Sequence, residues 1–360
     1  MKIRLNKVFT SLNFFLILFL VFSVFSYTAI AQDEFPNETT GFTYSTDPIK
    51  APPYKVGVSN FSVLNSWRVQ MIAEINAEAK RQGDLIEAIY ITNSNESLPK
   101  QISDFEDLIA KGCDIIIIDP MSSTGLLPVI EKAHELGIIV VDFDSNINTE
   151  NISGHILVDN GEFGKVGAEY IVEKLNGKGK IIVLNGIKGA GIDQIREQGA
   201  MNVFEQYPDI EILGKAWAHW DYAQGKRATE DFLAAHPQID GVWSQGGAMT
   251  QGAMEAFVEA GRPLVPMAGE DNNGYLKLWK EYQSQGFSGY SASMPTYTGA
   301  TALGLALNII QGRPYHKYTK IPIPTFGDEL LDEYLKPDLP DSYWANTRLS
   351  DEAAKEMFAR

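Results

Sequence analysis

The stretch from Cys113 to Ser145 constrains the fold of this chain more than any other. It holds two short runs of almost wholly apolar, β-branched residues, 115–118 and 138–141, separated by an amphipathic helical pattern. Strands buried on both faces of a parallel sheet have this composition, whereas half-exposed strands alternate apolar and polar residues. The stretch therefore predicts a strand–helix–strand unit in an α/β fold.

The helix expected inside this unit has an apolar stripe formed by Leu126, Leu127, Ile130, Ala133 and Leu136. We expect Ser122 or Ser123 to cap its start and Gly137 to lie just beyond its end. Pro128 should fall in the first turn, where a helix tolerates proline.

Each of the two apolar strands ends in a carboxylate. Asp119 follows the first strand, and Asp142 and Asp144 follow the second. In open α/β sheets, ligands bind beyond the carboxyl ends of the strands. Asp119 and Asp144 are therefore candidate ligand-binding residues; the alternative is that each is a solvated loop residue or a helix cap.

The rest of the chain repeats this rhythm. Strand and helix patterns alternate over residues 54–160 and again over residues 162–293. At 360 residues the chain is long enough for two domains. We expect two similar doubly wound parallel-sheet lobes, followed by a charged tail, 327–360, that resembles no site.

The N-terminus has the pattern of a signal peptide. Lys2, Arg4 and Lys7 precede an apolar run at 14–25, and Ala29-Ile30-Ala31 has the small-x-small form of a cleavage site. An uncleaved anchor is the alternative, but the run is short for a span of ~20 residues. We expect cleavage after Ala31, an extended segment over 32–53, and a protein exported to the periplasm.

Charge and cysteine content exclude several classes of function. With 30 Lys+Arg against 46 Asp+Glu, the net charge of −16 argues against nucleic-acid binding. Cys113 is the only cysteine, so no internal disulfide forms and no cysteine after the cleavage site can carry a lipid. We expect Cys113 to be an inert core residue, since a catalytic thiol needs a base and an exposed setting.

Polar and aromatic residues gather at the expected strand ends. Carboxylates, amides and guanidinium groups match sugar hydroxyls, and flat aromatic rings pack on the apolar faces of sugar rings. Each residue alone also has a structural interpretation, for example as a core tryptophan or a surface ion-pair partner. The candidate ligand-binding residues are Asn65, Trp67, Arg68, Asp119, Asp144, Arg196, Trp220 and Asp271.

These residues lie within pieces of sequence that, in order and spacing, resemble type I periplasmic sugar-binding proteins, with a pattern close to the ribose binders. The resemblance runs from Tyr54 to about Thr325, and its pieces are Val56–Trp67, Gly112–Pro120, Gly137–Asp144, Val158–Asn160, Asn185–Gly199, Ala235–Pro237 and Gly269–Asp271.

The resemblance implies two lobes that close over one sugar and are joined by three crossovers, near Val158–Asn160, Ser293–Pro295 and Ile323–Phe326. We expect residues 54–158 plus 294–323 to form the first lobe and residues 159–293 plus 324–360 the second. It further implies a monomer that passes its ligand to an ABC transporter permease, without a cofactor. In the family's pattern the first lobe offers residues matched by Asn65, Trp67 and Asp144, and the second lobe residues matched by Arg196, Trp220 and Asp271.

Three positions depart from the ribose-binder pattern. Arg68 stands in place of a second aromatic residue, Ser145 in place of an arginine, and Gly246-Gly247 in place of an asparagine-bearing turn. Ribose itself is therefore not the expected ligand, and Arg68 with Arg196 suits a more polar one, such as a furanose, a polyol or a sugar acid.

Two other functions stay open. A secreted carbohydrate-active enzyme could use Asp144 and Asp271 as paired carboxylates, although no recognisable catalytic motif supports it. A sugar sensor that feeds a chemoreceptor or kinase would have the same fold and site. The five histidines are scattered without metal-ligand spacing, so no metal is expected.

Overall fold

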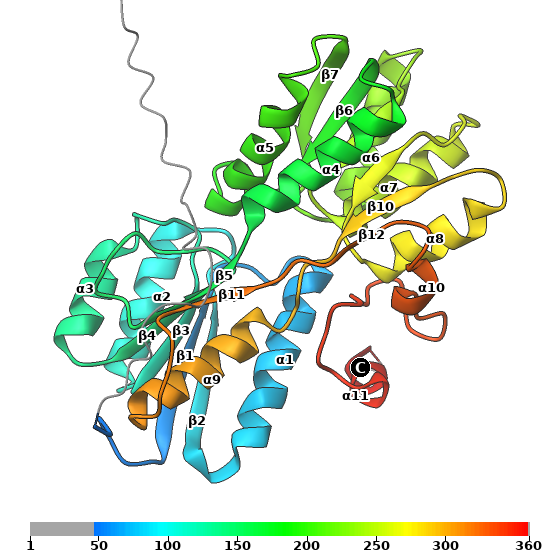
Figure 1. The fold of residues 1–360 in the computed structure, drawn as a ribbon. Helices are drawn as coiled ribbons and strands as arrows, with labels where there is room; N and C mark the ends of the chain where they lie inside the picture. Colours follow the sequence, from blue (N-terminus) through cyan, green and yellow to red (C-terminus); the bar gives the residue numbers. More distant parts are fainter. Residues whose placement is uncertain (1–46, 359–360) are drawn as a thin grey trace, which may run out of the picture. The chain divides into compact units, whose positions relative to one another are not determined.

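The computed structural model describes residues 47–358, which form two α/β lobes (Figure 1). The expected cleavage site after Ala31 and most of the segment 32–53 lie outside these residues. The first lobe is built on a six-stranded parallel sheet. Its strands, in spatial order, are β11 (Tyr318–Ile321), β5 (Gly154–Val158), β4 (Ile139–Phe143), β3 (Ile115–Asp119), β1 (Tyr54–Asn60) and β2 (Ile86–Asn93).

The second lobe has a six-stranded sheet of matching order. Only its edge pair, β12 with β10, is antiparallel. The chain passes between the sheets after β5, after β10, and between β11 and β12, which confirms two lobes joined by three crossovers. In spatial order the strands are β12 (Thr325–Phe326), β10 (Gly289–Ala292), β9 (Met267–Gly269), β8 (Gly241–Ser244), β6 (Gly179–Asn185) and β7 (Ile210–Trp217).

Helices cover both faces of the first sheet (Figure 1). Ile115 and Ile117 pack with α1 (Ser66–Gln82) and α9 (Thr298–Ile310), whereas Ile116 and Ile118 pack on the opposite face with α2 (Leu98–Ala110) and α3 (Leu127–Glu135). Successive side chains of a strand point to opposite faces, so a strand buried on both sides must be apolar throughout. The apolar runs that predicted this unit arise in this way.

The second sheet is covered in the same manner. Ile181 and Val183 pack with α4 (Asn160–Lys174) and α5 (Gly191–Phe204). On the other face, Ile182 and Leu184 pack with α7 (Gly247–Glu259) and α8 (Asn273–Gln283), with α6 (Tyr222–Ala235) beside α7.

Short elements complete the chain. A 3₁₀ turn, Gly83–Leu85, follows α1, and α10 (Leu331–Tyr334) and α11 (Asp351–Phe358) lie in the C-terminal tail, defined here as residues 327–358. The strands β11 and β12 are only four and two residues long. Neither was expected, because such short segments carry no clear periodicity.

One local expectation was wrong and two others are supported. The helix α3 begins at Leu127, so neither Ser122 nor Ser123 caps it; Ser122 Oγ instead accepts hydrogen bonds from the backbone of Thr124 and Gly125 in the preceding turn. Pro128 does lie in the first turn of α3. Cys113 is buried, and burial raises the pKa of its thiol to about 11, as suits an inert core residue.

Candidate ligand-binding site

One cavity, with about 330 Å³ of free space, lies among residues that follow strands of both sheets. Six of the eight residues predicted from the sequence line it. The full lining is Asn65, Trp67, Arg68, Asp144, Ile192, Arg196, Trp220, Glu270 and Trp344.

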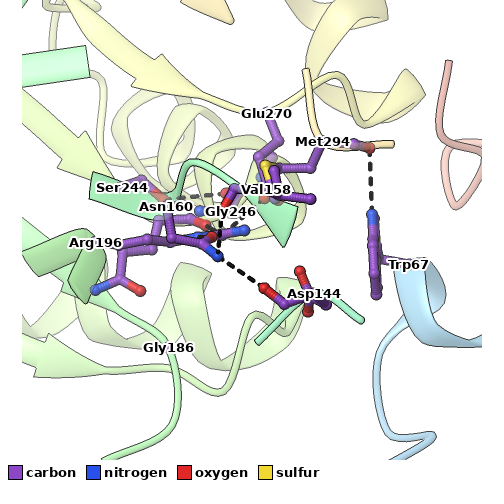
Figure 2. Close-up of polar contacts among 12 residues, drawn as sticks. Trp67, Asp144, Val158, Asn160, Gly186, Arg196, Ser244, Gly246, Glu270 and Met294 are labelled. Atoms are coloured by element: carbon purple, nitrogen blue, oxygen red, sulfur yellow. Dashed lines mark hydrogen bonds and ion pairs between the residues drawn. The ribbon is translucent and has the colours of Figure 1, made fainter. Parts of the chain in front are cut away.

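Asn65 and Trp67 enter the cavity at the start of α1. The side chain of Asn65 caps the helix, because its Oδ1 accepts a hydrogen bond of 3.0 Å from the backbone N–H of Arg68. The indole Nε1 of Trp67 donates to the backbone oxygen of Met294, 3.3 Å away (Figure 2). The ring is thus anchored at its polar edge, and its apolar surface is available to line the cavity.

Arg68 is held within the first lobe. Its guanidinium forms a buried ion pair with Asp119 and stacks over the ring of Phe61, 3.7 Å from the ring centroid. Its Nη1 also donates to Oδ1 of Asn60 over 3.4 Å. Asp119 is fully buried and does not line the cavity. It acts on the site through Arg68, whose orientation it fixes.

Asp144 lies directly after β4, with a positive φ of 65°. Its backbone oxygen accepts a 3.0 Å hydrogen bond from Nδ2 of Asn160 (Figure 2). Within residues 47–358, its buried Oδ1 has no hydrogen-bond partner. Burial raises the pKa of this carboxyl, although the positive charges of Arg196 and Arg68 oppose the rise. A buried acceptor without a partner costs roughly 1–3 kcal/mol, so a ligand hydroxyl there would be stabilising.

Arg196 projects from α5 and is fixed by three acceptors. Its Nε donates to Oδ1 of Asn160, and its Nη1 donates to the backbone oxygen of Gln245 and to Oε1 of Glu270, each over 2.9 Å. The guanidinium also stacks over the ring of Phe163, 4.1 Å from the centroid. None of these bonds uses Nη2. Since Arg196 lines the cavity, this group can donate to a ligand oxygen.

Glu270 is a cavity residue that the sequence did not single out. It forms a buried ion pair with Arg196, and its Oε2 accepts a 3.3 Å hydrogen bond from the backbone of Gly247 at the start of α7. Burial raises the pKa of its carboxyl to about 7, against the lowering effect of Arg196. Glu270 therefore positions Arg196 and also offers a polar surface to the cavity.

Trp220 lies in the turn after β7, with a positive φ of 51°. A Cβ added to Gly186 would meet its ring only 2.0 Å away, so the ring lies against the bare backbone of this glycine. Within the described part of the chain, the buried indole Nε1 has no partner. Trp220 thus lines the cavity with its indole ring, and its indole N–H is a donor that a ligand oxygen can accept from.

Asp271 does not line the cavity, although the sequence placed it among the ligand-binding candidates. It is fully buried, and its carboxylate accepts a 2.5 Å hydrogen bond from the backbone of Asn346 in the C-terminal tail. Its backbone oxygen accepts another from Ala345. The structure thus brings Asp271 against the tail, and Glu270, one residue earlier, into the cavity.

Metal ligands and membrane-spanning helices were also sought among the described residues. Across residues 47–358, no group of three or more histidine, cysteine, aspartate or glutamate side chains is arranged to hold a metal ion. The same described residues contain no helix that is long and apolar enough to cross a membrane.

Residues 56–314 match the profile of the periplasmic binding protein domain family. The match spans well over half of the chain. The protein belongs to the periplasmic binding protein family.

Several known proteins are similar in sequence or structure to this periplasmic binding protein. It is 28% identical over 270 residues to the ribose import binding protein of Bacillus subtilis (strain 168), covering 75% of this chain and 86% of the relative. It is 30% identical over 221 residues to the xylitol-binding protein of Mycolicibacterium smegmatis (strain ATCC 700084 / mc(2)155). This match covers 61% of this chain and 63% of the relative. Among solved structures, an ABC transporter solute binding protein from Thermobispora bispora DSM 43833 superposes with a TM-score of 0.76 at 26% identity. The superposition covers 84% of this chain and 94% of that chain.

Three cavity residues of this periplasmic binding protein escaped the sequence analysis. Ile192 directly follows the glycine-rich loop, residues 186–191, and Glu270 directly precedes Asp271. Glu270 directly follows β9, so its position at a strand end was the signal that marked it. Trp344 lies in the tail, far from any predicted strand end, and no local pattern marks it.

Proposed function

We propose that this periplasmic binding protein captures a neutral monosaccharide or a related polyol between its lobes and delivers it to an ABC transporter. One observation carries the proposal. Among the described residues 47–358, Oδ1 of Asp144 is a buried acceptor without a partner. Asp144 lines the same cavity as three tryptophans and as Arg196, whose Nη2 takes no part in the three hydrogen bonds that hold its guanidinium.

This combination suits a polyhydroxylated ligand. A carboxylate oxygen accepts from a sugar hydroxyl, and a guanidinium donates to hydroxyl or ring oxygens. The rings of Trp67, Trp220 and Trp344 offer apolar surfaces to the C–H groups of the ligand. The guanidinium of Arg196 is already held in place by three acceptors, which reduces the entropic cost of ordering it on binding.

The charges around the cavity favour a neutral ligand over a sugar acid. Arg68 is paired with Asp119, and Arg196 with Glu270. Asp144 adds a further carboxyl group to the lining. An anionic ligand would find both guanidinium groups already compensated and would approach this carboxyl group, which costs free energy in a site of low dielectric constant.

The comparisons support the class of ligand and the role in transport. The named relatives bind or import ribose and xylitol, and the solved structure is an ABC transporter component. We accordingly propose export to the periplasm after cleavage behind Ala31, a monomeric state, and capture by hinge closure at the three crossovers. Ligand transfer to a permease, rather than turnover, is the proposed outcome of binding.

A thermal-shift screen of refolded, ligand-stripped protein lacking residues 1–31 tests this proposal. The panel contains pentoses, hexoses, furanose-rich sugars, polyols and sugar acids. A ligand at 100 times its dissociation constant should add about 2.7 kcal/mol to the free energy of unfolding. We expect a hit among the neutral sugars or polyols, recovered chemically unchanged. A hit confined to sugar acids would overturn the neutral-ligand proposal, and conversion of the hit would favour an enzyme.

A further inference from the structure

The C-terminal tail contributes to the cavity. Trp344 lies between α10 and α11, outside both sheets, yet it is 1% exposed and lines the cavity with residues of both lobes. The strand-end positions that predicted the other cavity residues do not extend to this segment.

Trp344 is fixed to the first turns of α1. Its backbone N–H donates to Oε1 of Gln70 over 3.0 Å, and its backbone oxygen accepts from Nε2 of the same residue over 2.9 Å. The indole Nε1 donates to Oγ of Ser66 over 2.9 Å. Ser66 directly precedes Trp67, so the two tryptophans are positioned by the same helical turn.

The neighbouring tail residues are fixed to the second lobe. Asn346 donates its backbone N–H to the carboxylate of Asp271 over 2.5 Å, and Trp344 forms an isolated β-bridge with Asn272. The side chain of Asn273 donates to the backbone oxygen of Leu339 over 2.9 Å. The segment around Trp344 therefore bonds to both lobes within a few residues.

The same segment also bonds to the crossover between β10 and α9. Nδ2 of Asn346 donates to the backbone oxygen of Ser293 over 3.2 Å, and the backbone oxygen of Asn346 accepts from the N–H of Thr296 over 3.0 Å. A displacement of one lobe relative to the other would have to be accommodated by these bonds. The tail is thus coupled to the part of the chain where a hinge would act.

We propose that Trp344 is a ligand-contacting residue, supplied by the C-terminal tail, that sets the affinity of the site. The inference rests on the proposed function. Because the indole N–H is already bonded to Ser66, Trp344 meets the ligand with its ring surface, which recognises C–H groups rather than hydroxyls. The bonds of the tail to both lobes hold this ring in place against the bound ligand.

The test measures the dissociation constant of the panel hit by titration calorimetry for the wild type, W344A and W344F. Phe358→Ala serves as the matched control, because Phe358 packs on Tyr343 within the tail and does not line the cavity. We expect W344A to weaken binding at least tenfold, W344F to weaken it less, and F358A to bind within twofold of wild type. Urea unfolding of each variant establishes that it is folded.

Two results would overturn the inference. In the first, the wild type binds the ligand and a folded W344A binds it with an affinity within twofold of the wild type. Trp344 would then only pack in the core, and the proposed function would stay intact. If W344A does not fold, W344F takes its place. A folded W344F with unchanged affinity and unchanged preference among the panel ligands would also show that Trp344 only packs in the core. Absence of any binding by the wild type would remove the proposed function as well.

Discussion

Arg196 donates a hydrogen bond of 2.9 Å from Nη1 to Oε1 of Glu270, and both side chains are buried and line the same cavity. The pair connects α5 with the end of β9 in the second lobe. Removing one partner from a buried ion pair leaves an uncompensated charge, which is usually more costly than the net value of the pair. The pair thus fixes the arginine that faces the ligand.

Replacing Arg196 by lysine should weaken ligand binding at least tenfold. Lysine keeps the charge but cannot reproduce the fork that joins Asn160, Gln245 and Glu270. We expect the free energy of unfolding to fall by about 2 kcal/mol as buried acceptors lose partners. Titration calorimetry and urea unfolding measure the two effects.

The matched control for this variant is R262K. Arg262 also donates to backbone oxygens of its own lobe, those of His236 and Pro237, but it does not line the cavity. R262K should bind the ligand like the wild type. Equal affinities of R196K and wild type would contradict the role given to the guanidinium.

Replacing Asp144 by asparagine should separate binding from stability. The partnerless Oδ1 is proposed to accept a ligand hydroxyl. Asparagine keeps one acceptor oxygen but loses the negative charge that strengthens this hydrogen bond, and it replaces the other oxygen by an NH2 donor, so the change should weaken binding by roughly 10–100-fold. Burial raises the pKa of Asp144, so its ionised form destabilises the fold at neutral pH. The free energy of unfolding of D144N should therefore equal or exceed that of the wild type.

The exposed Asp84→Asn, which removes a carboxylate far from the cavity lining, controls for the change in net charge. Calorimetric titration and urea unfolding of both variants check the prediction. A large loss of stability in D144N, or unchanged affinity, would sink it.

Replacing Gly186 by alanine should disturb Trp220. The added Cβ would lie 2.0 Å from the indole ring, so the ring must move. Overpacking of this kind costs about 1–3 kcal/mol of stability, and the displaced ring should also weaken ligand binding. Gly191→Ala, five residues on at the start of α5, is the control, because its Cβ would meet its nearest atom, Oγ of Ser145, at 3.8 Å. If the two variants have the same affinity and stability, the packing argument fails.

The stability of the glycine-rich loop should depend on pH through Asp193. Its carboxylate accepts hydrogen bonds from the backbone of Gly186 and from Nε1 of Trp217, and burial raises its pKa to about 6. An unfolded aspartate ionises near pH ~3.9. Between these values the folded state holds the proton more tightly, so the contribution of Asp193 to stability is present at low pH and is lost as pH rises through 6.

D193N isolates this contribution, since asparagine does not titrate. The free energy of unfolding of the wild type minus that of D193N should fall by on the order of 1 kcal/mol between pH 4 and about 6.5 and then level off. Urea unfolding at several pH values gives this difference. A difference that stays constant or rises with pH would contradict the assignment.

The sequence predicted the fold because the strands have a double-sided burial pattern. Residues 115–118 are apolar throughout since each sheet face is covered by helices, and no half-exposed strand would allow this. It also predicted most of the cavity lining. Parallel strands bring their carboxyl ends to one edge of a sheet, so Asn65 and Asp144, which follow β1 and β4 of the first sheet, reach the same cavity. Trp220, which follows β7, reaches it from the second sheet.

The directions of individual side chains could not be predicted in this way. Asp119 ends its strand as expected, but its carboxylate pairs with Arg68 and does not line the cavity. Asp271 bonds to the tail, because Asn346 offers it a backbone donor. Both outcomes depend on contacts between distant segments, and such contacts leave no local periodicity in the sequence.

Trp344 illustrates the same limit most clearly. It is bonded to Ser66, which precedes it by most of the length of the folded chain, and it lies in a segment with only short helical pieces. The tail was expected to resemble no site, and the structure contradicts that expectation by bringing one of its rings to the cavity.

A crystal structure of the protein with the ligand from the thermal-shift screen tests the central claim most directly. The account predicts one ligand in the cavity, with a hydroxyl hydrogen-bonded to Oδ1 of Asp144, an oxygen bonded to Nη2 of Arg196, and tryptophan rings against its C–H faces. A ligand bound elsewhere, or bound in this cavity without contact to either Asp144 or Arg196, would contradict the account.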